Sequence, residues 1–327
     1  MNAFLGVDGG GTETEFLVVD ETGRILAAHR AGSAYYLEIG LDALQTLIEE
    51  GIHTVFEQAS MSPAEITFAC IGLPAYGEDR AVTDRLNGIA SGVLPAGRYR
   101  CVNDMVSGWA GALGCRDGIN VVASTGSIAY GEFAGRTARA GGWGELFSDE
   151  GSSFWVACEA LALFSRMSDG RADKGPLYEL MRAHFRVRED LDLCAAVYGP
   201  PPMTRSQIAG LAAIATRAHR AGDVAVQRLF VAAAQELAEI VHAVRSNLAI
   251  PPQTSLPVSY SGSMFRPGSV LTPIFEDLLQ SDERTYIFTV PQASPCAGTV
   301  LYAARLAGMP LTPDAVGQLA GRRAAVL

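Results

Sequence analysis

The chain has 327 residues, of which 49% are hydrophobic, so it is long enough for about two globular domains with a sizeable core. Its 25 Lys and Arg against 35 Asp and Glu give a net charge of −10 without any basic run, which argues against a nucleic-acid-binding protein. Because the sequence opens without a secretory signal and has no apolar stretch of roughly 18 residues, we expect a cytoplasmic protein without membrane contacts.

The first part of the chain predicts three strands followed by alternating helices and strands. Apolar residues recur at helical spacing over 41–56, whereas EITFACIGL at 65–73 is β-branched and apolar, as strands are. The predicted strands are 4–8, 15–20, 24–29, 65–73 and 99–103, and the predicted helices are 41–56, 79–93 and 105–113.

The same order of elements starts again after residue 115. The predicted strands are 118–124, 128–133, 136–140, 257–261 and 285–290, with a long helical insertion after the third and helices at 272–279 and 296–306. The duplicated βββαβαβα order predicts two α/β lobes, residues 1–115 and 116–327, around a central cleft where a ligand binds. The closing helix 296–306 is expected at the lobe junction.

The first hairpin loop, within VDGGGTET at 7–14, combines a carboxylate, three glycines and two threonines. Glycine lacks the Cβ that blocks close approach and tolerates positive φ angles, so successive N–H groups can point at one phosphate. The loop STGS at 124–127 occupies the equivalent place in the second half. Taken alone, either stretch also fits an ordinary turn; together they favour a phosphate site.

Four segments share their order and content with one superfamily: VDGGGTET at 7–14, VNDMVSGWAGAL at 102–113, ASTGS at 123–127 and YSGSMFRPG at 260–268. They resemble the sugar kinase, Hsp70 and actin superfamily. GGWGELFSDEGSSFWVACEAL at 141–161 is similar to the segment GGWGxxxxDEGSxxW of N-acetylglucosamine kinases in the BadF/BadG/BcrA/BcrD ATPase family. The resemblance implies a ribonuclease H-like, actin-like ATPase fold and ATP-dependent phosphorylation of N-acetylglucosamine or glucosamine.

The resemblance also implies which residues bind the nucleotide. Asp8 would hold Mg²⁺ through water, because this cation keeps several waters and takes few carboxylates. The glycine-hydroxyl loops would grip the phosphates, and the late glycine would let adenosine lie flat on the backbone. The implied ATP-binding residues are Asp8, Gly9, Gly10, Gly11, Thr12, Thr14, Thr125, Gly126, Ser127, Gly262 and Ser263.

Two carboxylates are candidates for the acceptor side. Asp104 follows a predicted strand at its carboxyl end, where it could accept the proton of the attacking sugar hydroxyl, or it could simply cap the next helix. Asp149 resembles the family's sugar-hydroxyl ligand, with capping of a helix from Gly151 as the alternative. Trp143 and Trp155 are expected to pack rather than to stack on a substrate. The implied acceptor residues are Tyr35, Tyr76, Gly77, Asp104, Gly142 and Asp149.

Two tyrosines depart from the family pattern. GSAYYLEIG has Tyr35 where the family usually has asparagine, and LPAYGEDR at 73–80 has Tyr76 where small residues are usual. These departures predict a narrower acceptor pocket or one suited to another ring.

Other readings compete with the kinase. ATPases that activate dehydratases share an iron–sulfur cluster held by cysteines, but the six cysteines here are scattered without close pairs and favour core thiols. A nucleotide sensor without turnover would be expected to lose the acid after the fifth strand, and Asp104 is present. We expect the protein to form a homodimer.

Overall fold

The computed structural model describes residues 2–321. Contacts divide the chain into two compact units, one of Met1–Asn120 with Thr289–Leu327 and one of Val121–Phe288. The predicted lobes, 1–115 and 116–327, remain a prediction, and the units differ from them mainly in where the segment after Thr289 is counted.

A mixed sheet forms the centre of the first unit. Its strand order is β3-β2-β1-β4-β5, with β1 antiparallel to β2 and parallel to β4, and β4 parallel to β5. The strands are β1 Ala3–Gly9, β2 Thr14–Asp20, β3 Ile25–Ala31, β4 Phe68–Leu73 and β5 Tyr99–Asn103. Because β1, β4 and β5 are parallel, their carboxyl ends meet at one edge of the sheet, which is where ligands of α/β sheets bind.

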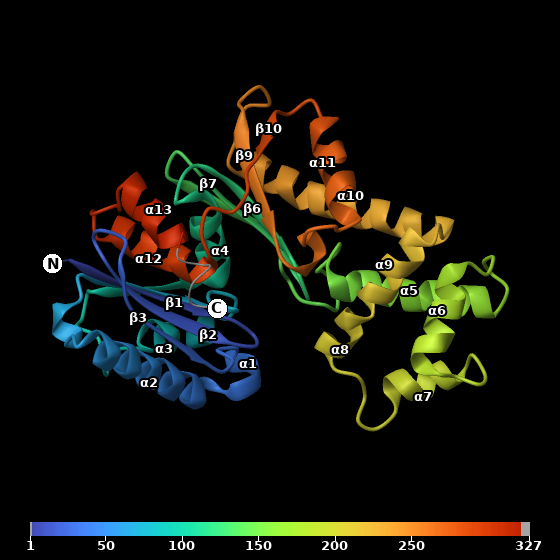
Figure 1. The fold of residues 1–327 in the computed structure, drawn as a ribbon, viewed down its shortest axis with the longest axis horizontal. Helices are drawn as coiled ribbons and strands as arrows, with labels where there is room; N and C mark the ends of the chain where they lie inside the picture. Colours follow the sequence, from blue (N-terminus) through green and yellow to red (C-terminus); the bar gives the residue numbers. More distant parts are fainter. Residues whose placement is uncertain (1, 322–327) are drawn as a thin grey trace. The chain divides into compact units, whose positions relative to one another are not determined.

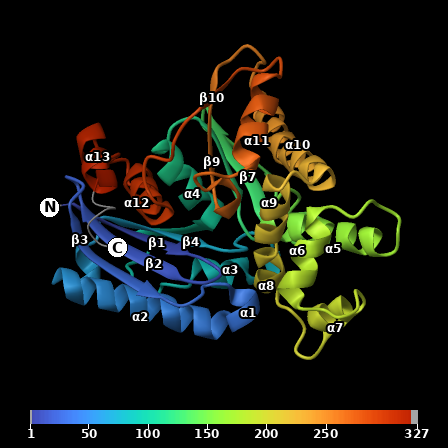
Figure 2. The same cartoon turned by 45° about the vertical axis from the view of Figure 1, so that its right-hand side comes forward.

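Helices cover both faces of this sheet (Figure 1). The long helix α2, Leu41–Ala59, packs on β2 and β3, whereas α4, Asp104–Leu113, and α12, Pro295–Leu306, cover the opposite face. Gly6 of β1 permits this contact, because a Cβ there would lie 2.7 Å from the Val300 backbone nitrogen. Figure 2 shows α2 and α12 on opposite sides of the strands.

The smaller elements of this unit are α1 Tyr36–Ile39, α3 Thr83–Asn87, α13 Pro313–Gly321 and 3₁₀ turns at Pro63–Glu65 and Arg80–Val82. The predicted helix over 79–93 is wrong over most of its length. The helix ends at Gly88, which its high backbone entropy makes a poor helix former, and only turns follow before Pro95.

The second sheet repeats the first. Its order, β8-β7-β6-β9-β10, corresponds strand for strand to β3-β2-β1-β4-β5, which confirms the predicted duplication. The strands are β6 Gly118–Ala123, β7 Ser127–Phe133, β8 Arg136–Gly141, β9 Leu256–Ser261 and β10 Tyr286–Phe288. The two glycine-hydroxyl loops therefore occupy equivalent positions, after β1 and after β6.

The long insertion is helical, as predicted. Its helices are α5 Ser153–Ser168, α6 Pro176–Phe185, α7 Asp192–Tyr198, α8 Arg205–Gly210, α9 Ala212–Arg220 and α10 Val224–Asn247, and α11 Leu271–Gln280 follows β9. The apolar stripe of α10 is buried against β7, β8 and α11. Asp223 caps α10 and also accepts a hydrogen bond from the Leu177 amide at 2.9 Å, which joins α10 to α6.

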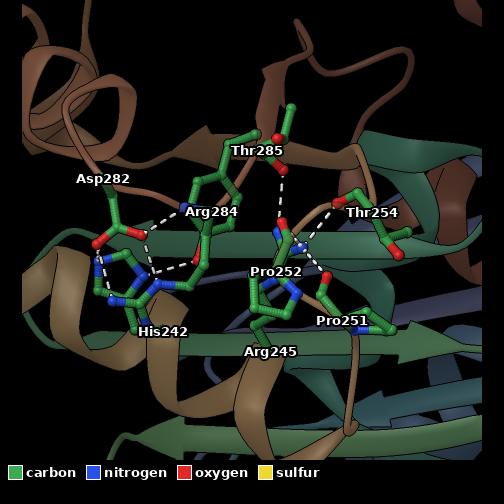
Figure 3. A network of polar contacts seen from close by, with 9 residues as sticks. His242, Arg245, Pro251, Pro252, Thr254, Asp282, Arg284 and Thr285 are labelled. Carbon is green, nitrogen blue, oxygen red and sulfur yellow. Dashed lines mark hydrogen bonds and ion pairs between the residues drawn. The ribbon is translucent and has the colours of Figure 1, made fainter.

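A buried arginine fixes the connection between α10 and β9 (Figure 3). The side chain of Arg245 is 1% exposed, and its guanidinium donates to the carbonyl oxygens of Pro252, Thr254 and Thr285 at 2.7–2.9 Å and to that of Pro251. A buried cation needs such partners. The Arg245 contacts therefore hold the start of β9 and β10 to α10.

Candidate functional site

The first glycine loop is a tight, defined turn. The Gly10 amide donates to the Glu13 carbonyl at 2.9 Å, which closes the turn and leaves Gly11 and Thr12 exposed. Thr14, in contrast, is buried and donates its hydroxyl to the Gly32 carbonyl at 2.7 Å. The loop thus leaves two residues of the predicted set accessible as donors, while the buried Thr14 holds the loop to Gly32.

The glycines of this loop serve close packing more than unusual backbone angles. A Cβ on Gly9 would lie 2.8 Å from the Ala34 Cβ and 2.9 Å from the Gly72 carbonyl oxygen. Positive φ angles occur at many glycines of the chain, but residues 9–11 are not among them. The expectation that positive φ turns these N–H groups toward a phosphate is therefore wrong for this loop.

Asp8 and Asp104 form a carboxylate pair at the sheet edge. Asp8 lies near the end of β1, and Asp104 begins α4 directly after β5. Burial raises the pKa of Asp8 well above its ordinary value, the charges of Asp104 and Glu15 add to this rise, and the Ser107 hydroxyl opposes it. Two carboxylates that repel each other in a half-buried site favour a bound cation.

Glycine in the neighbouring strand lets α4 approach this pair. A Cβ on Gly72 of β4 would lie 2.3 Å from the Ser107 hydroxyl oxygen and 3.6 Å from the Asp104 Cα. Within residues 2–321 no group of three or more His, Cys, Asp and Glu side chains could hold a metal. A cation at Asp8 would therefore need water and substrate oxygens as further ligands, and this fits Mg²⁺, which is bound in that way.

The capping explanation for Asp104 is wrong. Asn103 is the N-cap of α4, since its side-chain oxygen accepts a hydrogen bond from the Met105 amide at 3.1 Å. The side-chain amide of Asn103 also donates to the Tyr76 carbonyl oxygen at 3.0 Å, which joins the 73–80 loop to the start of α4. Asp104 stands in the first turn, where the helix dipole favours a carboxylate.

A cavity of about 590 Å³ opens in the first unit beside this loop. Asp8, Gly10 and Thr12 line part of it, and the N-terminus of α12, including Cys296, lines another part. Burial raises the pKa of the Cys296 thiol well above its ordinary value, and its Sγ lies 3.5 Å from the Glu15 carbonyl oxygen. The cavity is large enough for a small ligand, and Cys296 is a core thiol, as predicted.

The two unusual tyrosines belong to the first unit. Tyr35 precedes α1 and packs, half-buried, on the core of this unit. The Tyr76 hydroxyl donates to the Asn87 side chain at 2.6 Å, so its ring is turned toward α3. Gly77 is exposed with φ +84°, a conformation that favours glycine.

In the second unit the loop 124–127 is tied to the acidic segment that follows β8. The Ser127 amide donates to the Asp149 carboxylate at 3.2 Å, and the Ser127 hydroxyl donates to the Glu150 carbonyl at 2.7 Å. The Ser153 amide donates to the Ser124 carbonyl at 2.8 Å. Thr125 and Gly126 remain partly exposed between these anchors.

The late glycine loop joins the same cluster. Gly262 has φ +99°, and a Cβ there would lie 2.3 Å from the Ala123 carbonyl oxygen, so only glycine fits. The Ser263 hydroxyl lies 3.0 Å from that of Ser153 and 3.4 Å from that of Ser124. Three of the sequence segments thus converge in the second unit: 123–127, 149–153 and 260–263.

Asp149 is the buried carboxylate of this cluster. Its side chain forms an ion pair with Arg205 of α8, and Glu145 reaches the same guanidinium at 3.3 Å. Burial raises the pKa of Asp149, while the Ser127 amide and the Arg205 charge lower it. The capping explanation for Asp149 is wrong, because Ser152 caps α5.

Sequence reasoning missed Arg205. Thr204 and Gln207 form a capping box around it, so the stretch reads as an ordinary helix start. The signal that could have drawn attention to Arg205 is a cation directly after the polar cap in an insertion of a phosphate-handling fold.

Trp143 departs from its prediction. Its side chain is 70% exposed, so it is not a packing residue, and the Arg139 guanidinium lies 5.7 Å from its ring centroid. Trp155 is half-buried in the first turn of α5. Gly142 has φ +70°, and a Cβ there would lie 2.7 Å from the Ile128 side chain. The 141–147 segment therefore runs close to β7 and then exposes the aromatic rings of Trp143 and Phe147.

Comparison with known proteins gives relatives across nearly the whole chain. The N-acetyl-D-glucosamine kinase of Dictyostelium discoideum is 25% identical over 309 residues, which cover 92% of this chain and 97% of that protein. The N-acetylmuramic acid/N-acetylglucosamine kinase of Clostridium acetobutylicum is 28% identical over 250 residues, 75% of this chain and 79% of that protein.

Solved structures share the fold. A Chromobacterium violaceum protein assigned as an N-acetylglucosamine kinase has a TM-score of 0.66 at 25% identity, over 93% of this chain and 99% of its own. The ROK family glucokinase of Streptomyces griseus, in complex with glucose and AMPPNP, has a TM-score of 0.52 at 15% identity, over 93% of this chain and 99% of its own.

The helices described in residues 2–321 include none that is long and apolar enough to cross a bilayer. Residues 5–303 match the BadF/BadG/BcrA/BcrD ATPase family, to which this chain therefore belongs.

Proposed function

We propose that this protein is an ATP-dependent kinase that phosphorylates a small amino sugar, N-acetylglucosamine or glucosamine. The observation that carries the proposal is the position of Asp104. It begins α4 at the carboxyl edge of the sheet, it interacts electrostatically with Asp8, and Asn103 performs the capping that would otherwise explain it. The relatives named as N-acetylglucosamine kinases support the same activity.

Phosphoryl transfer needs positioning and charge neutralisation more than covalent chemistry by the protein. In the proposed reaction a sugar hydroxyl attacks the γ-phosphorus in line, the bond between that phosphorus and the bridging oxygen breaks, and ADP leaves. Asp104 accepts the hydroxyl proton. Asp8 would hold Mg²⁺ through water, and the bound cation would neutralise phosphate charge.

The remaining predicted residues take their roles in the same proposal. The loop after β1 and the loop after β6 would donate N–H and O–H groups to the phosphates, and Gly262 and Ser263 would carry the adenosine. Asp149, Gly142, Tyr35, Tyr76 and Gly77 would form the acceptor side. A homodimeric state and a cytoplasmic location belong to this proposal as well.

The test is ADP release with Mg-ATP and a panel of N-acetylglucosamine, glucosamine and neutral hexoses. We expect an amino sugar to give the highest kcat/KM. Asp104→Asn should keep ATP affinity and lower kcat by at least ~10²-fold, as loss of a general base does. Asp314→Asn, in the first turn of α13, is the matched control and should leave kcat unchanged.

Two outcomes would contradict the proposal. If the Asp104→Asn protein turns over near the wild-type rate, Asp104 is not the general base. Wild-type protein that hydrolyses ATP at the same rate with and without every sugar would instead support the alternative, an ATPase that acts as an activator or sensor.

A further inference from the structure

We propose that Arg205 is a positioning residue for the sugar acceptor, which it serves by holding the Asp149 carboxylate against the loop 124–127. This inference rests on the proposed kinase function. Arg205 comes from the helical insertion, 56 residues after Asp149 in the sequence, and lies in the same compact unit.

The contacts place the guanidinium and the carboxylate side by side on the loop backbone. A Cβ on Gly126 would lie 2.9 Å from each carboxylate oxygen of Asp149 and 3.0 Å from Nη2 of Arg205. One carboxylate oxygen accepts the Ser127 amide at 3.2 Å, and the other accepts the Arg205 guanidinium. The ion pair therefore joins the residue proposed to bind the sugar to a loop proposed to bind phosphate.

The start of α8 is itself fixed, which gives Arg205 a defined direction. The Thr204 amide donates to the Gln207 side chain at 2.8 Å, and the Gln207 amide donates to the Thr204 hydroxyl at 3.3 Å. Arg205 is the first residue of the helix between these two partners.

Two features of Asp149 accord with a functional role. Asp149 is 3% exposed, although burial disfavours a charge, and its backbone has φ +62°, which is uncommon for a residue with a side chain. Such features persist at functional sites. The Arg205 side chain is 36% exposed, whereas that of Asp149 is 4% exposed.

The charges around Asp149 explain what Arg205 contributes. Burial raises the pKa of Asp149 and the Glu145 charge adds to this, whereas the Ser127 amide and Arg205 lower it. Without Arg205, no cation would oppose the effect of the Glu145 charge, so the pKa of Asp149 would rise further. A protonated carboxyl accepts a hydrogen bond from a sugar hydroxyl less strongly than a carboxylate.

The experiment compares Arg205→Gln, Arg205→Lys and Arg205→Ala with wild type, using the best acceptor of the sugar panel between pH 5.5 and 9. Arg205→Gln should raise the acceptor KM by about tenfold at pH 7, with a change of less than about twofold in the KM for ATP. Its acid limb of kcat/KM, the fall in kcat/KM at low pH, should move to higher pH than in wild type. Arg205→Lys keeps the positive charge but loses the planar guanidinium group. The pH of the acid limb should therefore stay as in wild type, while the acceptor KM should still rise.

Arg205→Ala allows rescue, because removal of a side chain that is 36% exposed leaves space that a guanidinium ion can enter from solvent. Added guanidinium chloride, against equal sodium chloride, should restore part of the acceptor affinity. Arg182→Gln is the matched control, because Arg182 forms an ion pair with Asp190 in the same unit at a similar exposure of 29%. That control should change thermal stability without changing the acceptor KM or the pH profile.

The outcomes separate the two proposals. If wild type turns over sugar normally but Arg205→Gln leaves the acceptor KM and the acid limb unchanged, this inference alone is overturned. Effects of the same size in Arg182→Gln would overturn it too. Wild-type protein that phosphorylates no sugar would overturn the proposed function, and this inference with it.

Discussion

The backbone of Gly298 in α12 lies directly on that of Gly111 in α4. A Cβ on residue 298 would stand 2.1 Å from the Gly111 amide nitrogen and 2.4 Å from the Ser107 carbonyl oxygen. Real Cβ atoms do not approach other atoms so closely, so the two helices meet without side chains between them. The position of α4, which begins with Asp104, is therefore set by α12.

Gly298→Ala should force these helices apart. Overpacking of a tight contact typically costs about 1–3 kcal/mol, so we expect a lower melting temperature. Because α4 carries Asp104, kcat should also fall, while the KM for ATP changes less. Gly317→Ala in α13 is the control, since a Cβ there would meet no atom of the described residues within 4 Å. A Gly298→Ala protein as stable as wild type would show that the helices are less tightly packed.

Asp8→Asn should stabilise the protein without ligand and abolish stabilisation by Mg-ATP. The raised pKa of Asp8 means that the folded state favours the protonated form, so stability is lost as pH rises from the ordinary value of 3.8 through the folded pKa. The increase in the free energy of unfolding caused by Asp8→Asn should thus be larger at pH 7.5 than at pH 4. Thermal scans with and without Mg-ATP measure both effects. A loss of stability at pH 7.5 would show that the ionised Asp8 is held by favourable contacts.

Asp282 should stabilise the folded protein at neutral pH, which is the opposite of the effect expected for ionised Asp8. Its hydrogen bond with Arg284 is the main cause that lowers the pKa to about 2, and His242 adds to this (Figure 3). The stabilisation is complete above 3.8 and lost as pH falls toward 2. Asp282→Asn should lower the free energy of unfolding at pH 7, and the difference from wild type should vanish near pH 2.

The control for this measurement is Asp169→Asn, which breaks a pair with Arg171 on the surface. Exposed pairs contribute little, so urea unfolding at pH 7 should show no measurable change. An equal loss in the free energy of unfolding in Asp282→Asn and Asp169→Asn would mean that the Asp282 contacts act as an ordinary surface ion pair.

Tyr35→Asn should shift acceptor preference toward N-acetylglucosamine. Asparagine offers two donors and an acceptor to sugar hydroxyls, and it is also a favoured residue at the N-terminus of α1, where Tyr35 stands. We expect the ratio of kcat/KM for N-acetylglucosamine over glucosamine to rise by about tenfold, the effect of about one hydrogen bond. Tyr35→Phe is the control that removes the hydroxyl alone. If both ratios equal that of wild type, Tyr35 does not line the acceptor site.

Local patterns predicted the strands well, because most of them are short apolar runs bounded by turn residues. The same reasoning failed at 79–93, where apolar spacing suggested a helix but Gly88 and Gly92 favour turns. The candidate site divides in the same manner. The glycine-hydroxyl loops are local and were identified from their residues, whereas the contact of Arg205 with Asp149 depends on the folding of the whole insertion, which no short pattern encodes.

The first unit is made of two pieces of chain, and this determines when it can be completed during synthesis. All five strands of its sheet have been made by residue 103, but α12, which covers one face of β1 and β4, follows only after the whole of Val121–Phe288. At 5–20 residues per second, that delay is roughly 10–40 s on the ribosome. During this time the apolar face under α12 is uncovered, so we expect the growing chain to depend on chaperones that shield such surfaces.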